Sequence, residues 1–141
     1  GEGYLNNQLR AQASSLGLGD VVAFAGFRED LDSYVSCFDL FAHPALAEGL
    51  GVAALKAAAA SVPVVGFAAG GMVEAVADEK TGLLVASEDS DALGAAIARF
   101  VENPDLGDQF GRAGRERMQN EFSIATMADK HVELYESVLE D

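Results

Sequence analysis

The sequence predicts an α/β fold in which helices flank a parallel sheet, and two observations carry this prediction. Short apolar runs of strand length recur along the chain, for example at residues 21–26 and 62–67. They alternate with segments whose apolar residues recur at helical spacing, such as Leu93, Ile97 and Phe100. Strands and helices that alternate in this way form βαβ units, which build parallel sheets.

Six elements are expected in the first half of the chain, and each has a local cause. Gly17 can end the first helix, because glycine readily adopts the left-handed conformation that follows many helix C-termini. Six alanines give residues 51–61 a high helix propensity. Pro63 is tolerated at the head of a strand, where a missing N–H costs little. In chain order the elements are a helix at 6–16, a strand at 21–26, a helical segment at 28–36, a strand at 40–43, a helix at 51–61 and a strand at 62–67.

The second half of the chain predicts one more strand, at 82–86, and four helices. Ser and Asn side chains cap helix N-termini, and Pro suits the first helical position. The expected helix starts are the loop before Met72, Ser90, Asn103–Pro104 and Ser123. The helix after Asn103 has a predicted buried stripe of Leu106, Phe110 and Ala113.

Composition limits the classes of function. With 141 residues and 50% hydrophobic side chains, residues 1–141 suit one domain with a substantial core. A net charge of −14 argues against nucleic acid as a partner, because phosphate binding needs clustered Lys and Arg. A single cysteine excludes an internal disulfide and fits a reducing compartment. Neither a membrane-spanning run nor a leader segment is apparent, so we expect a cytoplasmic location.

The loop at residues 44–51 is the strongest candidate for a ligand site. It follows the expected strand at 40–43, and ligands of parallel α/β sheets bind outside the carboxyl ends of strands. Gly49 and Gly51 let a ligand approach the backbone, and the N–H groups that begin the next helix can face an anion. Glu48 can accept hydrogen bonds from hydroxyl groups. The loop therefore predicts a polar, hydroxyl-rich ligand that can carry phosphate.

Other chemistries find little support in the sequence. The two histidines lie far apart, and no HExxH or paired-cysteine spacing indicates a metal site. No GxSxG nucleophile elbow is present. The opening Gly1-Glu2-Gly3 is half of a GxGxxG motif and has no strand before it, which disfavours an NAD-binding Rossmann domain.

Seven segments together form a more specific pattern. In order they are GEG, VVAFAGF, FDLFAHP, AEGLGVAALKAAAASVPVV, AAGGMVEAV, TGLLV and EFSIATMADKHVELYESV. Over essentially the whole chain, this set resembles the C-terminal, donor-binding domain of retaining glycosyltransferases with the GT-B fold, the "group one" family. The resemblance implies a Rossmann-like parallel sheet, of which about four strands are retained here. It also implies transfer of a sugar from a nucleotide-diphosphate sugar to an acceptor.

The resemblance implies roles for individual residues. The residue that matches Glu48 hydrogen-bonds the hydroxyl groups of the transferred sugar, so Glu48 is the candidate catalytic residue. No cofactor is implied, since the donor is a UDP-, GDP- or ADP-sugar. The donor-binding candidates are Gly49, Leu50, Gly51 and Val52 beside the diphosphate and sugar, Phe27 and Arg28 at the nucleobase, Lys56 on the helix, and Gly71, with Gly70, in a second glycine-rich loop.

Lys56 is the main departure from the family pattern. The family has a second glutamate at this position, and its carboxylate accepts hydrogen bonds from the ribose hydroxyls. An ammonium group accepts none. The position is expected to face the interior, roughly 7 to 8 Å along the helix from Gly51 at ~1.5 Å per residue. Lys56 either contacts a donor phosphate as a point charge or marks a weakened donor site.

The resemblance also implies segments beyond these 141 residues. In the family, an Arg and a Lys from the preceding segment neutralise the donor phosphates, and a separate N-terminal domain binds the acceptor. We therefore expect the first strands of this domain to be absent and the fragment alone to be inactive. Either the expected strand at 21–26 pairs with the strand at 40–43, or a sheet edge stays open and favours self-association. The full-length protein is expected in the cytoplasm or at the periphery of the inner membrane.

Two functions remain open at this point. The chain is either the donor-binding half of a glycosyltransferase or a non-catalytic, degenerate α/β binding module that has lost its donor chemistry at Lys56. The other chemistry-bearing side chains are expected to be structural. These are His43 at a strand end, a buried Cys37, a partly buried His131, Glu74 in the first turn of a helix, and Arg112, Arg115 and Arg117 on a solvated helix face.

Overall fold

The computed structural model describes residues 3–139, so Gly1 and Glu2 of the expected glycine-rich start lie outside the described residues. The chain divides into two units after Ser33. Each unit is described by itself below.

The first unit contains one α-helix, α1 (Asn6–Ser15), and a 3-10 helix, η1 (Leu31–Ser33). The end of α1 is a Schellman motif, as expected from its glycine. Gly17 has a φ of +71°, and the N–H of Leu18 donates to the carbonyl of Ala13 at 2.8 Å. The guanidinium of Arg10 lies 4.6 Å from the centre of the Phe24 ring.

The expected strand at 21–26 is wrong. Residues 22–28 have no regular secondary structure, and Val21 is exposed. An apolar run becomes a strand only when a neighbouring strand satisfies its backbone and a packed layer covers its side chains. The described residues of the first unit contain no strand to pair with it. The sheet therefore has three strands, where the resemblance implies about four.

The second unit is built on a parallel sheet in the order β1 (Phe41–His43), β2 (Val64–Phe67), β3 (Gly82–Val85). Val64 of β2 aligns with Phe41 on one side and with Gly82 on the other. Every residue of β2 is buried. This explains its unbroken apolar sequence, since a central parallel strand is covered on both faces. The expected α/β class with a parallel sheet is confirmed.

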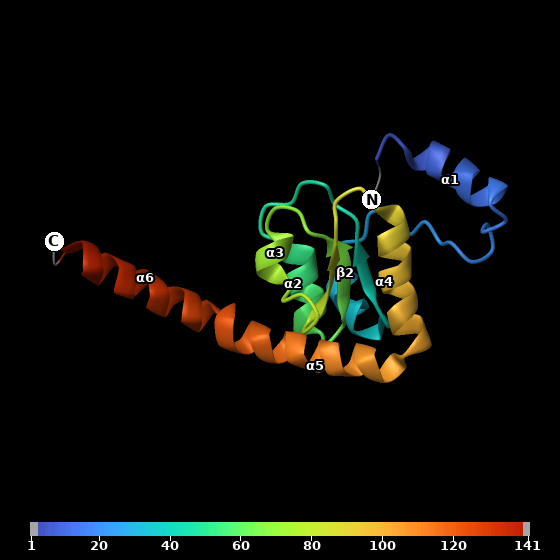
Figure 1. The fold of residues 1–141 in the computed structure, drawn as a ribbon. Helices are drawn as coiled ribbons and strands as arrows, with labels where there is room; N and C mark the ends of the chain where they lie inside the picture. The colour runs from blue at the N-terminus through green and yellow to red at the C-terminus, as the bar shows by residue number, and fades with distance from the viewer. Residues whose placement is uncertain (1–2, 140–141) are drawn as a thin grey trace. The chain divides into compact units, whose positions relative to one another are not determined.

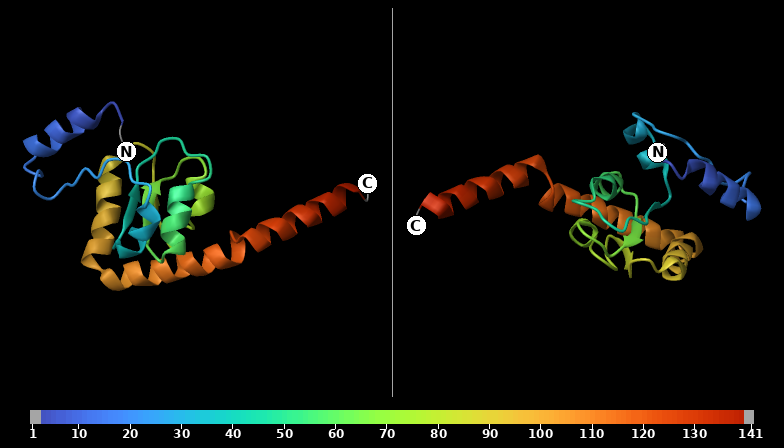
Figure 2. Two further views of the ribbon diagram at one scale, coloured as in Figure 1. Left: turned by 180° about the vertical axis from the view of Figure 1, so that it is seen from behind. Right: turned by 90° about the horizontal axis from the view of Figure 1, so that it is seen from above.

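Helices cover both faces of this sheet (Figure 1). Val64 packs with buried residues of α2 (Val52–Ala59) and α3 (Met72–Ala75), whereas Val65 packs with α4 (Ser90–Glu102) and α5 (Pro104–Glu121). Adjacent residues of a strand point to opposite faces, so α2 and α3 cover one face of the sheet and α4 and α5 cover the other. Figure 2 shows the same arrangement from behind, with α5 crossing the end of the sheet opposite the 44–51 loop. A short 3-10 helix, η2 (Val35–Cys37), precedes β1.

Helix caps follow the sequence closely, with one correction. Asn103 accepts from the N–H of Leu106 and caps α5, as expected. The last helix, α6 (Ile124–Leu139), begins after Ser123, whose Oγ accepts from the N–H of Thr126 at 3.0 Å. The cap of α4 is Asp89, which accepts from the N–H of Ala92, and Ser90 is already inside the helix. Two neighbouring residues could both cap, and the carboxylate holds the position.

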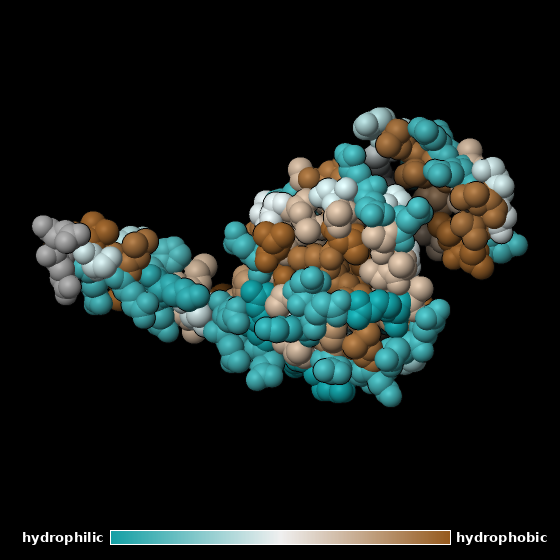
Figure 3. Space-filling view, viewed as in Figure 1, coloured by the Kyte–Doolittle hydropathy of each residue, from teal (hydrophilic) through white to brown (hydrophobic). Residues whose placement is uncertain are grey.

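The helix α6 has no buried residue, although its sequence is amphipathic. His131 is exposed, against expectation, and its Nδ1–H donates to the carbonyl of Met127 at 2.7 Å. Exposed apolar side chains are visible near the C-terminal end of α6, while the outer face of α5 is hydrophilic (Figure 3). Within residues 3–139, no helix combines the length and apolar character needed to cross a membrane.

The buried face of α5 differs from the predicted stripe. Phe110 is buried as expected, but Leu106 and Ala113 are only half-buried. The rest of the face is Gly107, Gly111, Gly114 and Met118. A Cβ on Gly111 would overlap the carbonyl oxygen of Ser61, which follows α2. Because α5 and α2 approach closely, these positions favour glycine. The spacing of hydrophobic residues does not predict such positions.

This contact gives a stability prediction with an internal control. Gly111→Ala should lower the free energy of unfolding by about 1–3 kcal/mol, because the new methyl group must displace backbone. Gly94→Ala, on an open position of α4 with no atom within 4 Å, should raise it by about 0.5–1 kcal/mol. Urea unfolding measures both. Equal stabilisation by the two substitutions would contradict the packing described.

Candidate functional site

The loop that follows β1 places Glu48 against the end of its own strand. His43 is the last residue of β1, and its Nε2 lies 2.9 Å from Oε2 of Glu48. The His43 ring stacks on Phe41, with ring centres 5.7 Å apart. The two side chains of the pair remain 21% and 28% exposed. The strand therefore orients the carboxylate, which stays accessible to a ligand.

The pKa of Glu48 lies below its usual value of 4.5. The hydrogen bond with His43 is the largest cause, and partial burial opposes it by raising the pKa. Backbone hydrogen bonds from Gly51 and Gly49 lower the pKa further. The sequence predicted that the N–H groups at the start of α2 face an anion. In the structure the carboxylate of Glu48 lies there and supplies the negative charge.

Gly51 makes this geometry possible. It is the N-cap of α2 with a φ of +71°, a left-handed conformation that side chains rarely adopt. A Cβ at Gly51 would lie 3.3 Å from Cβ of Ala75, in α3. The helix start therefore packs directly on α3, and Val52 is exposed at its first turn.

The second glycine-rich loop closes on the first. The N–H of Gly71 donates to the carbonyl of Glu48 at 3.0 Å. A Cβ on Gly70 would overlap that same carbonyl oxygen, and one on Gly71 would overlap the carbonyl oxygen of Gly49. Both positions admit only glycine without rearrangement. The structure thus brings Glu48, Gly49, Gly51 and Gly71 together, while Leu50 is exposed beside them.

Lys56 lies on the outer face of α2. It is exposed, so the expectation that position 56 faces the interior is wrong. The buried positions of this helix are the small residues Ala54, Ala57 and Ala58, which pack toward the sheet and α5. Lys56 lines a groove of about 420 Å³ between α2, the end of α5 and the residues before α6. The other lining residues are Val52, Leu55, Ala59, Arg115, Met118, Gln119, Phe122 and Ser123.

Phe27 and Arg28, the nucleobase candidates, belong to the first unit. Phe27 is 68% exposed. The guanidinium of Arg28 forms an exposed ion pair with Asp30 at 3.0 Å. Both side chains lie at the surface of that unit.

Three residues differ from their expected structural roles. His43 contacts the candidate catalytic carboxylate, and its spacing of five residues from Glu48 is the only sequence signal for this. Cys37 is exposed, because the short η2 helix leaves it outside the core. Arg117 is mostly buried and bonds the backbone of α3, whereas Arg112 and Arg115 are exposed as expected. Glu74 lies in the first turn of α3.

The family model of glycosyl transferases group 1 matches residues 1–117. The chain belongs to this family. It is 38% identical over 110 residues to alpha-maltose-1-phosphate synthase from Mycolicibacterium smegmatis. The aligned residues cover 74% of this chain and 28% of the relative. It is 33% identical over 134 residues to D-inositol 3-phosphate glycosyltransferase from Streptomyces coelicolor, and the aligned residues cover 92% of this chain and 29% of that relative.

Solved structures of similar proteins share the fold. Sucrose-phosphate synthase from Thermosynechococcus elongatus superposes with a TM-score of 0.83 at 33% identity, over 95% of this chain and 34% of that one. HepE from Anabaena, in complex with UDP, gives a TM-score of 0.86 at 27% identity, over 93% and 36%. The Rossmann-like GT-B architecture expected from the resemblance is thereby confirmed. The chain spans about a third of the length of these relatives.

Proposed function

We propose that this chain is the donor-binding half of a glycosyltransferase that moves a sugar from a UDP-, GDP- or ADP-sugar to an acceptor. The observation that carries the proposal is the closure of the Gly70–Gly71 loop on the backbone of Glu48 and Gly49. Two glycine-rich loops meet here at the carboxyl ends of parallel strands, beside an oriented carboxylate. The UDP complex of HepE, a family relative, supports a nucleotide ligand for this fold.

Each residue of the site has a role in this proposal. Glu48 accepts hydrogen bonds from hydroxyl groups of the transferred sugar, and His43 holds its carboxylate in place. The backbone N–H of Val52, in the first turn of α2, faces the diphosphate, where the helix dipole favours negative charge. Leu50 offers exposed apolar surface to the sugar.

The chain alone is expected to bind a donor without turning it over. It spans about a third of its curated relatives, and we propose that the remainder of the full-length protein binds the acceptor. The net charge of −14 leaves few cations to neutralise a diphosphate. A partner domain that supplies cations would complete the site.

The open edge of the sheet is a second proposed contact. Among residues 3–139, β1 pairs with β2 and with no other strand. Unpaired strand edges favour association with another chain. Sedimentation velocity should therefore show association that increases with protein concentration, and a strictly monomeric species at all concentrations would contradict this.

Lys56 favours the second candidate function, a non-catalytic binding module. Lys56 carries an ammonium group at the position on α2 where the family has a carboxylate. The side chain is exposed and lines the groove between α2 and the end of α5. A hydrogen-bond donor there cannot accept from ribose hydroxyls. The two functions differ in whether the rest of the donor site is still competent.

Calorimetry on Lys56→Glu separates the two functions. We expect the variant to bind one of UDP, GDP or ADP about tenfold more tightly than the wild-type chain, because a carboxylate can accept from the ribose. Lys130→Glu, on the exposed helix α6, makes the same charge change and should leave affinity unchanged or lower. The net charge becomes −16 in both variants, from −14 with two units lost, so nonspecific electrostatics oppose any gain. No binding by either the wild type or Lys56→Glu would favour the non-catalytic module.

A further inference from the structure

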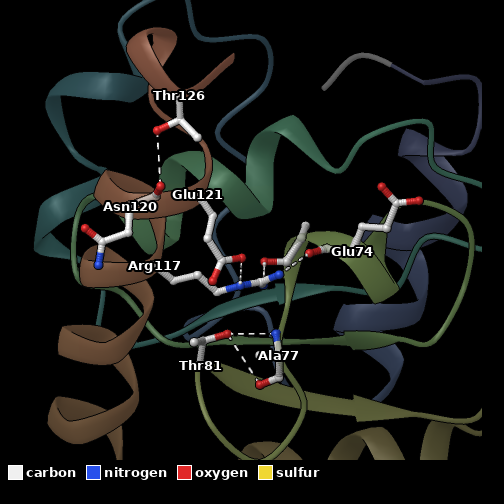
Figure 4. A network of polar contacts seen from close by, with 8 residues as sticks. Glu74, Ala77, Thr81, Arg117, Asn120, Glu121 and Thr126 are labelled. Atoms are coloured by element: carbon white, nitrogen blue, oxygen red, sulfur yellow. Dashed lines mark hydrogen bonds and ion pairs between the residues drawn. The ribbon is translucent and has the colours of Figure 1, made fainter. Parts of the chain in front are cut away.

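Arg117 joins α5 to the C-terminal end of α3 (Figure 4). Its Nη1 donates to the carbonyl of Ala75 at 3.0 Å, and its Nη2 donates to the carbonyl of Glu74 at 2.9 Å. Its Nε donates to Glu121 at 2.9 Å. The guanidinium also lies 5.1 Å from the ring centre of Phe122, and the side chain is only 20% exposed. The guanidinium group of Arg117 is thus fixed by three hydrogen bonds and an aromatic ring.

The helix α3 needs these external donors. It has four residues, so it forms a single turn, which is marginal by itself. The last carbonyls of any helix lack partners within the helix, and a cation near them complements the helix dipole. Arg117 satisfies two such carbonyls at once with fixed, parallel donors. A methionine side chain would donate to neither carbonyl, and a lysine ammonium group would lack this fixed spacing of donors.

The other end of α3 is the glycine-rich loop of the candidate site. Gly71 is the N-cap of α3, and its N–H donates to the carbonyl of Glu48 at 3.0 Å. The contacts of Gly70 and Gly71 with the Glu48 and Gly49 backbone leave no room for a methyl group. Met72, the first residue of α3, is completely buried, and its side chain lies near Gly51 and Gly66. A shift of α3 therefore moves the loop against Glu48, because close packing leaves no space to absorb it.

We propose that Arg117 is a positioning residue for the donor site. By holding the C-terminal end of α3, it keeps the Gly70–Gly71 loop against the backbone of Glu48 and Gly49. Its effect on donor binding rests on the function proposed above. Its effect on the loop is a property of this chain and can be measured without a ligand.

The test uses the full chain with Arg117→Met, Arg117→Lys and the control Arg112→Met, which removes an exposed arginine from the same helix. Amide hydrogen exchange by NMR reports on the N–H of Gly71 and, for comparison, on the amides of β2. In Arg117→Met we expect exchange at Gly71 to accelerate about tenfold, the effect of losing charge-assisted hydrogen bonds. Arg117→Lys should restore part of the protection. Arg112→Met should change nothing, and the β2 amides should change less than Gly71 in every variant.

Two results would overturn the proposal. Unchanged exchange at Gly71 in Arg117→Met would show that the loop does not depend on Arg117. Equal acceleration at Gly71 and throughout β2 would show that Arg117 stabilises the whole unit and does not position the loop. If Arg117→Met fails to fold, the same comparison in Arg117→Lys decides.

Nucleotide calorimetry then separates this inference from the proposed function. If the wild type binds UDP, GDP or ADP, Arg117→Met should weaken that binding several-fold while Arg112→Met does not. If the wild type binds none of the three, the proposed function fails, and the Gly71 exchange still decides the role of Arg117.

Discussion

Gly71→Ala is expected to abolish nucleotide binding and to lower the free energy of unfolding by about 1–3 kcal/mol. The added methyl group would overlap the carbonyl oxygen of Gly49 and lie 2.7 Å from Cα of Leu50. Both contacts are with backbone, so no side-chain rotation relieves them. The two glycine-rich loops must separate, which breaks the hydrogen bond from Gly71 to Glu48. Calorimetry and urea unfolding measure the two effects.

Gly94→Ala serves as the control for that substitution. It adds the same methyl group at an open position on α4, and it should leave nucleotide affinity unchanged. If Gly71→Ala kept the stability and nucleotide affinity of the wild type, the close contact between the loops would not exist in solution.

Glu48→Gln is expected to weaken donor-sugar binding by roughly 10- to 100-fold. A charged hydrogen bond contributes about 1.5–3 kcal/mol, and the amide replaces one acceptor oxygen by a donor. Affinity for the nucleotide without its sugar should change less, because Glu48 is assigned to the sugar hydroxyls. Glu74→Gln makes the same charge change in the first turn of α3 and should affect neither ligand. Equal binding of the donor sugar by Glu48→Gln and the wild type would remove Glu48 from the site.

The same variant gives a pH dependence with a definite sign. The pKa of Glu48 in the folded chain is lowered from 4.5, chiefly by the hydrogen bond with His43. A lowered pKa means that ionised Glu48 stabilises the fold above pH 4.5 and that this contribution is lost as the pH falls through the folded-state pKa. The Tm difference between the wild type and Glu48→Gln should therefore be largest near neutral pH and shrink below pH 4.5. A Tm difference that grew as the pH fell below 4.5 would contradict the His43–Glu48 contact.

Local signals account for the parts of the fold that the sequence predicts. The run at 62–67 is apolar because β2 is covered on both faces, and Gly17 and Asn103 end or begin helices through their own backbone or side chain. The segment at 21–26 has the same local character as β2. It is not a strand, because strand formation depends on a partner that the local sequence does not specify.

The site shows the same division. Glu48, Gly51 and Gly71 are identifiable from their motif. The structure also explains the two glycines, because Gly51 has a positive φ and Gly71 has no room for a Cβ. The roles of His43 and Arg117 were not predictable in the same way. His43 depends on where β1 ends, and Arg117 contacts carbonyls 42 and 43 residues away in the chain. The outward direction of Lys56 depends on which face of α2 the sheet covers.

We propose that a nucleotide-diphosphate sugar binds where the two glycine-rich loops meet. Titration of the 15N-labelled chain with UDP, GDP and ADP tests it most directly. We expect one of the three to shift the backbone amides of Gly51, Val52 and Gly71 in a saturable manner, with smaller changes in α6. Saturable shifts confined to other parts of the chain, or no shift at these amides with any of the three nucleotides, would contradict the claim.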